Sequence, residues 1–293
     1  MTSAITGGPG WHTDPATLQP VLDDEAAFRA ANATDPALEV VVALWSGEPD
    51  RAASLLKPVI DGDPTSLRLQ VLAADVIRAR GDTSTAIKIL EMLVGRHEYK
   101  SGEEMAVRNL GEALFAVGDY PHAAARFRRS LDLRLATEAE ASSVDASRTA
   151  LDRALALVPW PLTHTRAWGW GVAFLDGEIP EVDGEAPVIT SPLGLCIRVR
   201  NASDIEWQED GPDEQGPALV TIHVDRPSTF ARPRRAVVVD TMLETPSRSL
   251  RLDDAEGEIL LPAPGVRTRV VVSHHDDEWN QPDEVWIDLY PAS

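Results

Sequence analysis

The sequence predicts an α + β protein whose two structure types lie in separate domains. An N-terminal α-solenoid is expected over residues 15–158, and an antiparallel β-sandwich or barrel over residues 159–293. In the first half, a helix–turn–helix pattern recurs at spacings of 37 and 34 residues. After Pro159 helical periodicity stops, and short β-type runs alternate with Gly, Pro and Asp clusters. With 293 residues, the chain is long enough for two separate cores.

The third repeat carries the clearest pattern. Residues 109–120 read NLGEALFAVGDY, and Ala123 and Phe127 follow at the spacing of a second helix. Gly111 and Ala123 are expected where two antiparallel helices cross, because small side chains let the backbones approach closely. Large apolar residues should fill the space beside this crossing: Leu110, Leu114 and Phe127.

The same turn occurs twice earlier in the chain. Gly81 precedes Gly118 by 37 residues, and Gly47 precedes Gly81 by 34 residues. Each turn is followed by a small residue and, four positions later, a large apolar one: Ala52 and Leu56, then Ala86 and Leu90. The sequence therefore predicts three repeats, near residues 33–64, 67–98 and 104–135.

Residues 33–135 resemble the tetratricopeptide repeat family. The resemblance implies a stacked superhelix that binds a partner in its concave groove and catalyses nothing itself. In that family the first helix of each repeat lines the groove. The corresponding positions in this sequence are Arg68, Val71, Asp75 and Arg78 in the second repeat, and Met105, Arg108, Glu112 and Phe115 in the third.

Three of these groove positions are arginines: Arg68, Arg78 and Arg108. Arginine can hold a carboxylate through two hydrogen bonds, which favours an acidic peptide or a chain terminus as the ligand. The family's carboxylate-binding pattern uses Lys and Asn at several of these positions, so this sequence departs from it. The alternative is that the arginines merely pair with Asp75 and Glu112 on exposed faces.

The segments that flank the repeats are expected to differ from them. Residues 1–14 lack a basic head and an apolar stretch, so they read as a disordered leader and not as a signal peptide. Residues 15–32 and 136–158 are predicted as single helices that cover the two ends of the solenoid.

The second half contains eight predicted strands: 167–174, 193–199, 219–224, 236–243, 249–252, 258–261, 266–273 and 284–289. Residues 253–257 and 262–265 are predicted as hairpin turns. Residues 204–217 are rich in acidic side chains, Gly and Pro, and are predicted as a mobile loop.

Six of the eight tryptophans lie after residue 159. Trp168 and Trp170 are expected on one face of a strand, with Gly169 and Gly171 on the other. Such a face could bind a sugar or a peptide, but packing in a core or between domains is the preferred interpretation.

The end of the chain resembles small bacterial β-domains of the competence protein J type. The residues that carry this resemblance are a strand led by Pro and Gly, LPAPGVRTRV over 261–270, and a closing strand, EVWIDLYP over 284–291. That family includes an inhibitor of a nuclease.

The net charge of −20 is unevenly distributed. Residues 1–158 carry a net charge of −7, and residues 159–293 carry −13, from 24 acidic and 11 basic residues. A surface this acidic repels nucleic acids and anionic lipids, so neither is an expected partner. The β-domain could meet a basic protein; a solubility role or the composition of a GC-rich bacterial genome is the alternative.

No motif in the sequence assembles catalytic chemistry, so a non-enzymatic protein without cofactor or metal is expected. The one metal-like cluster is His274-His275-Asp276-Asp277-Glu278, where adjacent histidines of a strand would point to opposite faces. It is interpreted as a polar hairpin loop. The lone Cys196 fits a reducing, cytoplasmic location.

Two functions follow from these patterns. The preferred hypothesis is an adaptor or scaffold that holds a protein segment in the groove of the repeats. The alternative is an inhibitor or immunity-type protein whose acidic β-domain neutralises a basic toxin or nuclease.

Overall fold

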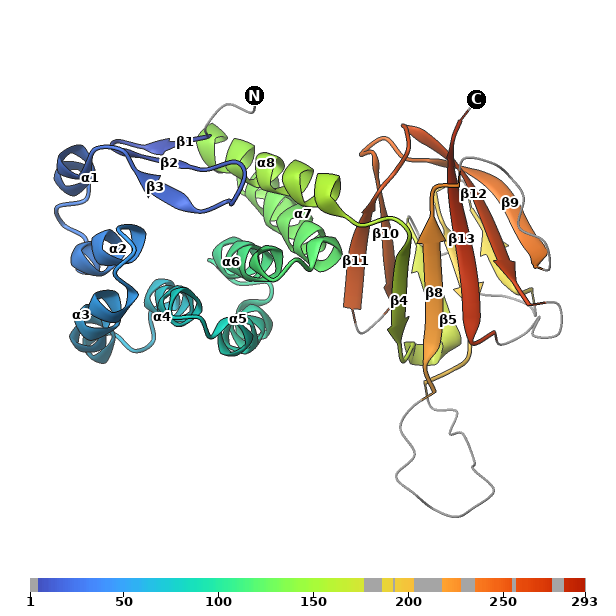
Figure 1. Ribbon diagram of the computed structural model, residues 1–293, viewed down its shortest axis with the longest axis horizontal. Coiled ribbons are helices and arrows are strands. Elements are labelled where there is room, and N and C mark those ends of the chain that lie inside the picture. The colour runs from blue at the N-terminus through green and yellow to red at the C-terminus, as the bar shows by residue number, and fades with distance from the viewer. Residues whose placement is uncertain are drawn as a thin grey trace, which may run out of the picture. The chain divides into compact units, whose positions relative to one another are not determined.

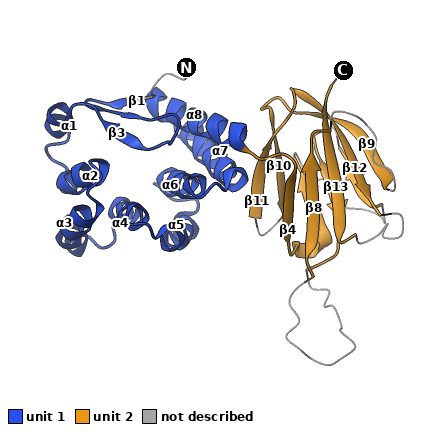
Figure 2. Cartoon of the chain, viewed as in Figure 1, with its two compact units in different colours: residues 1–157 blue, residues 158–293 orange. Residues whose placement is uncertain are grey.

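The computed structural model describes residues 5–176, 186–191, 193–202, 218–227, 235–254, 257–275 and 282–292. The chain forms two compact units, residues 1–157 (unit 1) and 158–293 (unit 2), as Figure 2 shows. Helices dominate unit 1 and strands dominate unit 2, so the protein is α + β. No described helix is both long enough and apolar enough to span a membrane.

Unit 1 contains a succession of helices in which each, from the second onward, packs against the next (Figure 1). They are α1 (Glu25–Ala31), α2 (Leu38–Trp45), α3 (Pro49–Gly62), α4 (Leu67–Ala79), α5 (Thr83–His97), α6 (Glu103–Ala116), α7 (Tyr120–Ala136) and α8 (Ala141–Leu157). Each predicted repeat contains one pair: α2 with α3, α4 with α5, and α6 with α7. The predicted terminal helix corresponds to α8.

One glycine turn recurs inside each pair. Gly47, Gly81 and Gly118 follow α2, α4 and α6, and their φ angles are 77°, 93° and 83°. A side chain is disfavoured in this left-handed region, which glycine adopts readily. The three turns therefore reverse the chain in the same way.

Small residues lie where the paired helices meet. Ala52, Ala86 and Ala123 are completely buried near the start of the second helix of each pair. In the third pair, a Cβ atom added at Gly111 would lie 2.7 Å from Cε1 of Phe127. This distance is shorter than any ordinary carbon–carbon contact, so α6 and α7 can cross here only because residue 111 has no side chain.

The predicted disordered leader over residues 1–14 is wrong for the described residues from Ile5 onward. β1 (Ile5–Gly8), β2 (Trp11–Thr13) and β3 (Pro20–Leu22) form an antiparallel sheet in the order β1-β2-β3. The indole of Trp11 occupies the space above Gly7, where a Cβ atom would lie 2.6 Å from the ring.

The predicted helix over residues 15–32 is reduced to α1, Glu25–Ala31. Asp14 does not cap a helix. Its carboxylate instead accepts hydrogen bonds from the backbone N–H of Ala16 and the hydroxyl of Thr17, which closes a turn between β2 and β3. The actual cap of α1 is Asp24, which accepts from the N–H of Ala27.

Unit 2 contains two five-stranded sheets, in the orders β11-β10-β5-β7-β6 and β4-β8-β13-β12-β9 (Figure 1). The first sheet consists of β5 (Val172–Leu175), β6 (Val188–Thr190), β7 (Leu195–Arg198), β10 (Ser249–Asp254) and β11 (Gly257–Pro262). The second consists of β4 (Leu162–Arg166), β8 (Val220–Asp225), β9 (Ala236–Glu244), β12 (Arg267–His274) and β13 (Glu284–Pro291). The predictions missed β4 and β6, which are short runs beside prolines.

The purely antiparallel topology was wrong, because β8 and β13 pair in parallel. A parallel pair needs a long crossover, and β9 to β12 provide it. Pro262–Gly265 does not close a hairpin either: β11 pairs with β10, and β12 pairs with β9 and β13, so this turn connects the two sheets. In the other predicted hairpin Asp254 lies opposite Gly257, and residues 255–256 lie outside the described residues.

The two tryptophans predicted on one strand face lie in different environments. A short 3-10 turn, Gly169–Gly171, interrupts the strand, and Trp170 adopts a φ of 62° within it. Trp168 is completely buried, whereas Trp170 is 82% exposed. The predicted mobile loop over residues 204–217 lies outside the described residues.

We expect Gly111→Leu to destabilise unit 1 because its side chain would overlap Phe127. Overpacking of this kind costs roughly 1–3 kcal/mol. The matched control is Gly95→Leu in α5, where an added Cβ atom has no neighbour within 4 Å. Thermal unfolding followed by circular dichroism should show a lower melting temperature for Gly111→Leu only. Equal melting temperatures in both variants would mean that the helices do not cross closely at residue 111.

Candidate binding pocket of the helical unit

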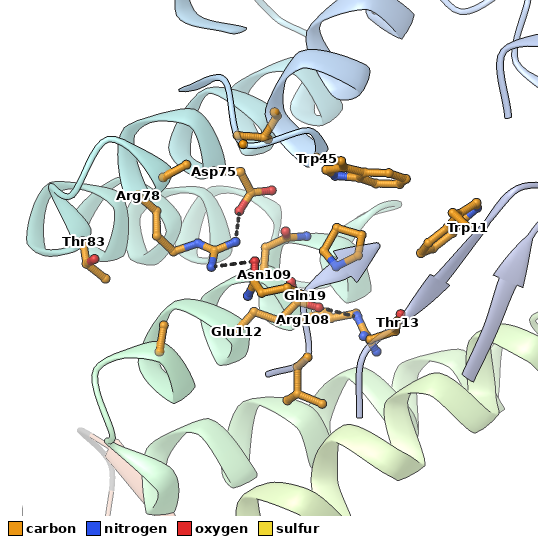
Figure 3. Close-up of a pocket in the computed structure, with 16 residues that line it drawn as sticks. Trp11, Thr13, Gln19, Trp45, Asp75, Arg78, Thr83, Arg108, Asn109 and Glu112 are labelled. Atoms are coloured by element: carbon orange, nitrogen blue, oxygen red, sulfur yellow. Dashed lines mark hydrogen bonds and ion pairs between the residues drawn. The ribbon is translucent and has the colours of Figure 1, made fainter. Parts of the chain in front are cut away.

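A cavity of about 500 Å³ lies within unit 1 (Figure 3). α2, α4 and α6 contribute to its lining, and so does the segment from β2 to the start of β3. Its polar lining residues include Gln19, Asp75, Arg78, Arg108, Asn109 and Glu112. A volume of this size is ordinary for a site that binds a small molecule or a few residues of a chain.

Four of the eight predicted groove residues line this cavity, and they form two ion pairs. Nη2 of Arg78 donates to Oδ1 of Asp75 at 3.0 Å, and Nε of Arg108 donates to Oε1 of Glu112 at 2.9 Å. The four side chains are between 11% and 18% exposed, so both pairs are largely buried. Arg78 and Arg108 therefore pair with Asp75 and Glu112, as the alternative interpretation held, but the pairs are buried and not on exposed faces. The charges of the four side chains balance.

The carboxyl group of Asp75 is perturbed by this environment. Burial raises its pKa to about 6, against the attraction of Arg78, and the negative charge of Glu112 raises it further. Asp75 and Glu112 therefore repel one another within the cavity, although each has its own arginine.

One wall of the cavity is aromatic. Trp11 from β2 and Trp45 from the end of α2 have ring centroids 4.9 Å apart, and Phe28 of α1 packs against Trp45 at 5.1 Å. Leu18 and Leu44 also line the cavity. This wall offers apolar surface beside the two ion pairs.

The turn between β2 and β3 enters the cavity. The backbone N–H of Leu18 donates to the carbonyl of Asp14, and Leu18 is only 1% exposed despite a φ of 59°. Nη1 of Arg78 donates to Oε1 of Gln19 at 3.3 Å, as Figure 3 shows. Contacts of β1 with α8 and of β3 with α2 hold the sheet in place.

The other four predicted groove residues do not line the cavity. Arg68 pairs with Asp35 at the start of α4. Val71 and Met105 pack in the core shared by α4, α5 and α6, and Phe115 is buried against Tyr120. The eight predicted groove residues therefore separate into four charged residues in the cavity, three buried or half-buried apolar residues, and Arg68, which pairs outside the cavity.

The cavity residues that the sequence analysis missed are Trp11, Leu18, Gln19 and Trp45. The sequence shows Gly7 and Gly8 before Trp11, and it shows the turn over residues 14–17. Neither feature reveals that this turn packs against helices 60 to 90 residues later.

Two histidines of the metal-like cluster in unit 2, His274 and His275, lie within the described residues. His274 is 3% exposed, and His275 points to Glu284, with Nε2 3.4 Å from its carboxylate. His223 stacks on Trp286 at 5.2 Å and also bonds Glu284, at 2.7 Å. Among the described residues, no three His, Cys, Asp or Glu side chains are placed to hold a metal ion. Residues 276–278 lie outside the described residues.

The chain shows little similarity to known proteins. No protein-family model and no curated protein sequence matches the chain. A solved structure that matches is ComJ of Bacillus subtilis, described as an inhibitor of the DNA-degrading activity of NucA. The match has 7% sequence identity, covers 45% of this chain and 96% of ComJ, and has a TM-score of 0.31. At this TM-score the likeness supports no inference about function.

We expect Asp75→Asn to change how stability depends on pH. The pKa of Asp75 rises from 3.8 to about 6 on folding, so the folded protein binds a proton in this interval that the unfolded chain has lost. Stability from this group is present below pH 4 and is lost as the pH rises through 6. The loss is on the order of 2–3 kcal/mol.

Denaturant unfolding between pH 4 and pH 7 measures this effect. The free energy of unfolding of the wild type should fall relative to that of Asp75→Asn across the interval. Asp61→Asn is the matched control, because the Asp61 carboxylate is exposed and pairs with Lys57. Parallel profiles for wild type and Asp75→Asn would contradict the perturbed environment of Asp75.

Proposed function

We propose that the chain is a non-enzymatic protein-binding protein that holds a segment of a partner in the cavity of unit 1. The observation that carries this proposal is the convergence of Asp75 and Arg78 from α4 with Arg108 and Glu112 from α6 on one cavity of about 500 Å³. Asp75 and Glu112 occupy equivalent positions of two consecutive predicted repeats, 37 residues apart, and Arg78 and Arg108 line the same space.

The proposal includes a fold assignment. Unit 1 is a solenoid of the tetratricopeptide type, supported by the three left-handed glycine turns and the buried alanines Ala52, Ala86 and Ala123. Unit 2 is a β-sandwich built from its two five-stranded sheets. Stacked helix pairs serve in binding because their inner surface is extended and rigid.

Capture of partners by the full-length chain tests this function. We expect proteins retained from a bacterial lysate by the wild type to be lost with the double variant Asp75→Ala, Arg108→Ala. They should still be retained by Arg68→Ala, because Arg68 lies outside the cavity and pairs with Asp35. Circular dichroism of each variant checks that it is folded. Retention of the same proteins by the double variant would contradict binding in the cavity.

A second candidate function is inhibition of a basic toxin or nuclease by unit 2. The observation that favours it is the net charge of −13 over residues 159–293. Such a field attracts a cationic protein and raises its association rate at low ionic strength.

For this second function, we expect a captured partner to be basic and its association rate to fall steeply with salt. The screening length shortens from about 30 Å at 0.01 M to about 8 Å at 0.15 M ionic strength. Surface plasmon resonance across this range measures the rate. A partner of acidic isoelectric point, or a rate that is flat in salt, would exclude this mechanism.

A further inference from the structure

The two carboxylates of the cavity retain unused hydrogen-bonding capacity. Asp75 and Glu112 each accept a hydrogen bond through one oxygen, from Arg78 and Arg108. Within the part of the chain that the structure describes, Oδ2 of Asp75 and Oε2 of Glu112 accept none. Both residues line the same cavity, on α4 and α6 (Figure 3). A donor placed between them would find two charged acceptors.

The electrostatics favour a cation at this point. Arg78 neutralises Asp75 and Arg108 neutralises Glu112, so these four side chains offer an added anion no excess positive charge. Burial and, to a smaller extent, the charge of Glu112 raise the pKa of Asp75. An added cation would reduce the repulsion between the two carboxylates. The net charge of −20 attracts cationic ligands to the protein as a whole.

The aromatic wall suits the same ligand. Trp11 and Trp45 line the cavity together with Leu18 and Leu44. Aromatic faces attract ammonium groups, and alkyl chains pack on indole rings. The cavity therefore combines acceptors for an ammonium group with apolar surface for its stem.

We propose that the cavity binds a primary ammonium group on an alkyl stem, the lysine side chain of a partner protein, with its charge between Asp75 and Glu112 and its stem against Trp11 and Trp45. This inference rests on the proposed function of unit 1 and replaces the acidic ligand expected from the arginines. Gln19 accepts a hydrogen bond from Nη1 of Arg78, so Arg78 uses a different nitrogen, Nη2, to bind Oδ1 of Asp75.

Three blocked pentapeptides test the proposal with the full-length chain. Each has one central residue between alanines, with an acetylated N-terminus and an amidated C-terminus. The central residue is lysine, norleucine or glutamate, and free lysine is a fourth probe. Binding is followed through the indole N–H resonances of Trp11 and Trp45. We expect the lysine peptide to bind at least tenfold more tightly than the other two peptides.

Variants locate the site. Asp75→Asn and Glu112→Gln should each weaken binding of the lysine peptide by about tenfold. Asp35→Asn is the matched control, since it removes a carboxylate that pairs with an arginine outside the cavity. If free lysine binds as tightly as the lysine peptide, the ligand is a small amine. That result would overturn the proposal that a lysine side chain of a partner protein occupies the cavity.

The sign of the pH dependence separates cationic from anionic ligands. The charged groups around Asp75 are Arg78 on its own helix and Glu112 and Arg108 on α6, with Arg134 of α7 close to Arg108. Because only the ionised form of Asp75 attracts a cation, affinity for the lysine peptide should fall by up to about tenfold from pH 7 to pH 5. Tighter binding of the lysine peptide at pH 5 would overturn the proposal.

The remaining outcomes separate this inference from the proposed function. Preferential binding of the glutamate peptide in the cavity would overturn the cationic ligand and leave protein binding by unit 1 standing. If none of the probes binds at millimolar concentration, the cationic ligand is also overturned. The capture experiment with the cavity variants decides the proposed function independently.

Discussion

The close approach of paired helices is the constraint on which unit 1 depends. At Gly111 the space for a Cβ atom is already taken by the ring of Phe127. On the second helix of each pair one alanine is completely buried: Ala52, Ala86 and Ala123. Left-handed glycines at the three turns reverse the chain in the same way. Asp75 of α4 and Glu112 of α6 are 37 residues apart, the same spacing as Gly81 and Gly118, and both face the cavity. The charged lining of the cavity follows from this packing.

The N-terminal sheet determines how that charged surface is presented. Without it, Asp75, Arg78, Arg108 and Glu112 would line an open helical face. The turn from Asp14 to Gln19 adds Leu18 and a hydrogen bond to Arg78, and Trp11 adds an aromatic wall with Trp45. These contacts bury two ion pairs. Burial of paired charges is favourable only when their hydrogen bonds are satisfied. Among the described residues, Nε of Arg78 and Nη1 of Arg108 are buried without a hydrogen-bond partner, so the cavity keeps unused hydrogen-bonding capacity.

The repeating part of the sequence carries the strongest local signal. Each of the three repeats expected from the spacing of Gly47, Gly81 and Gly118 contains one pair of helices, and four of the eight predicted groove residues line the cavity. The sheet of residues 5–22 was missed, because its three- and four-residue strands carry no periodicity and are stabilised by contacts with α2 and α8. Similarly, no local signal shows that the turn Gly169–Gly171 leaves Trp170 exposed while Trp168 is buried. The parallel pairing of β8 with β13 has no local signal either. These features depend on residues distant in the sequence.

Hydrogen–deuterium exchange of the full-length chain, with and without a captured partner, tests the central claim most directly. The account predicts that binding slows exchange in two segments far apart in the sequence, residues 13–20 and residues 105–116, together with the end of α4 around Arg78. These segments surround the cavity. Protection confined to residues 158–293, with unchanged exchange in unit 1, would contradict the claim that the cavity of the helical unit is the binding site.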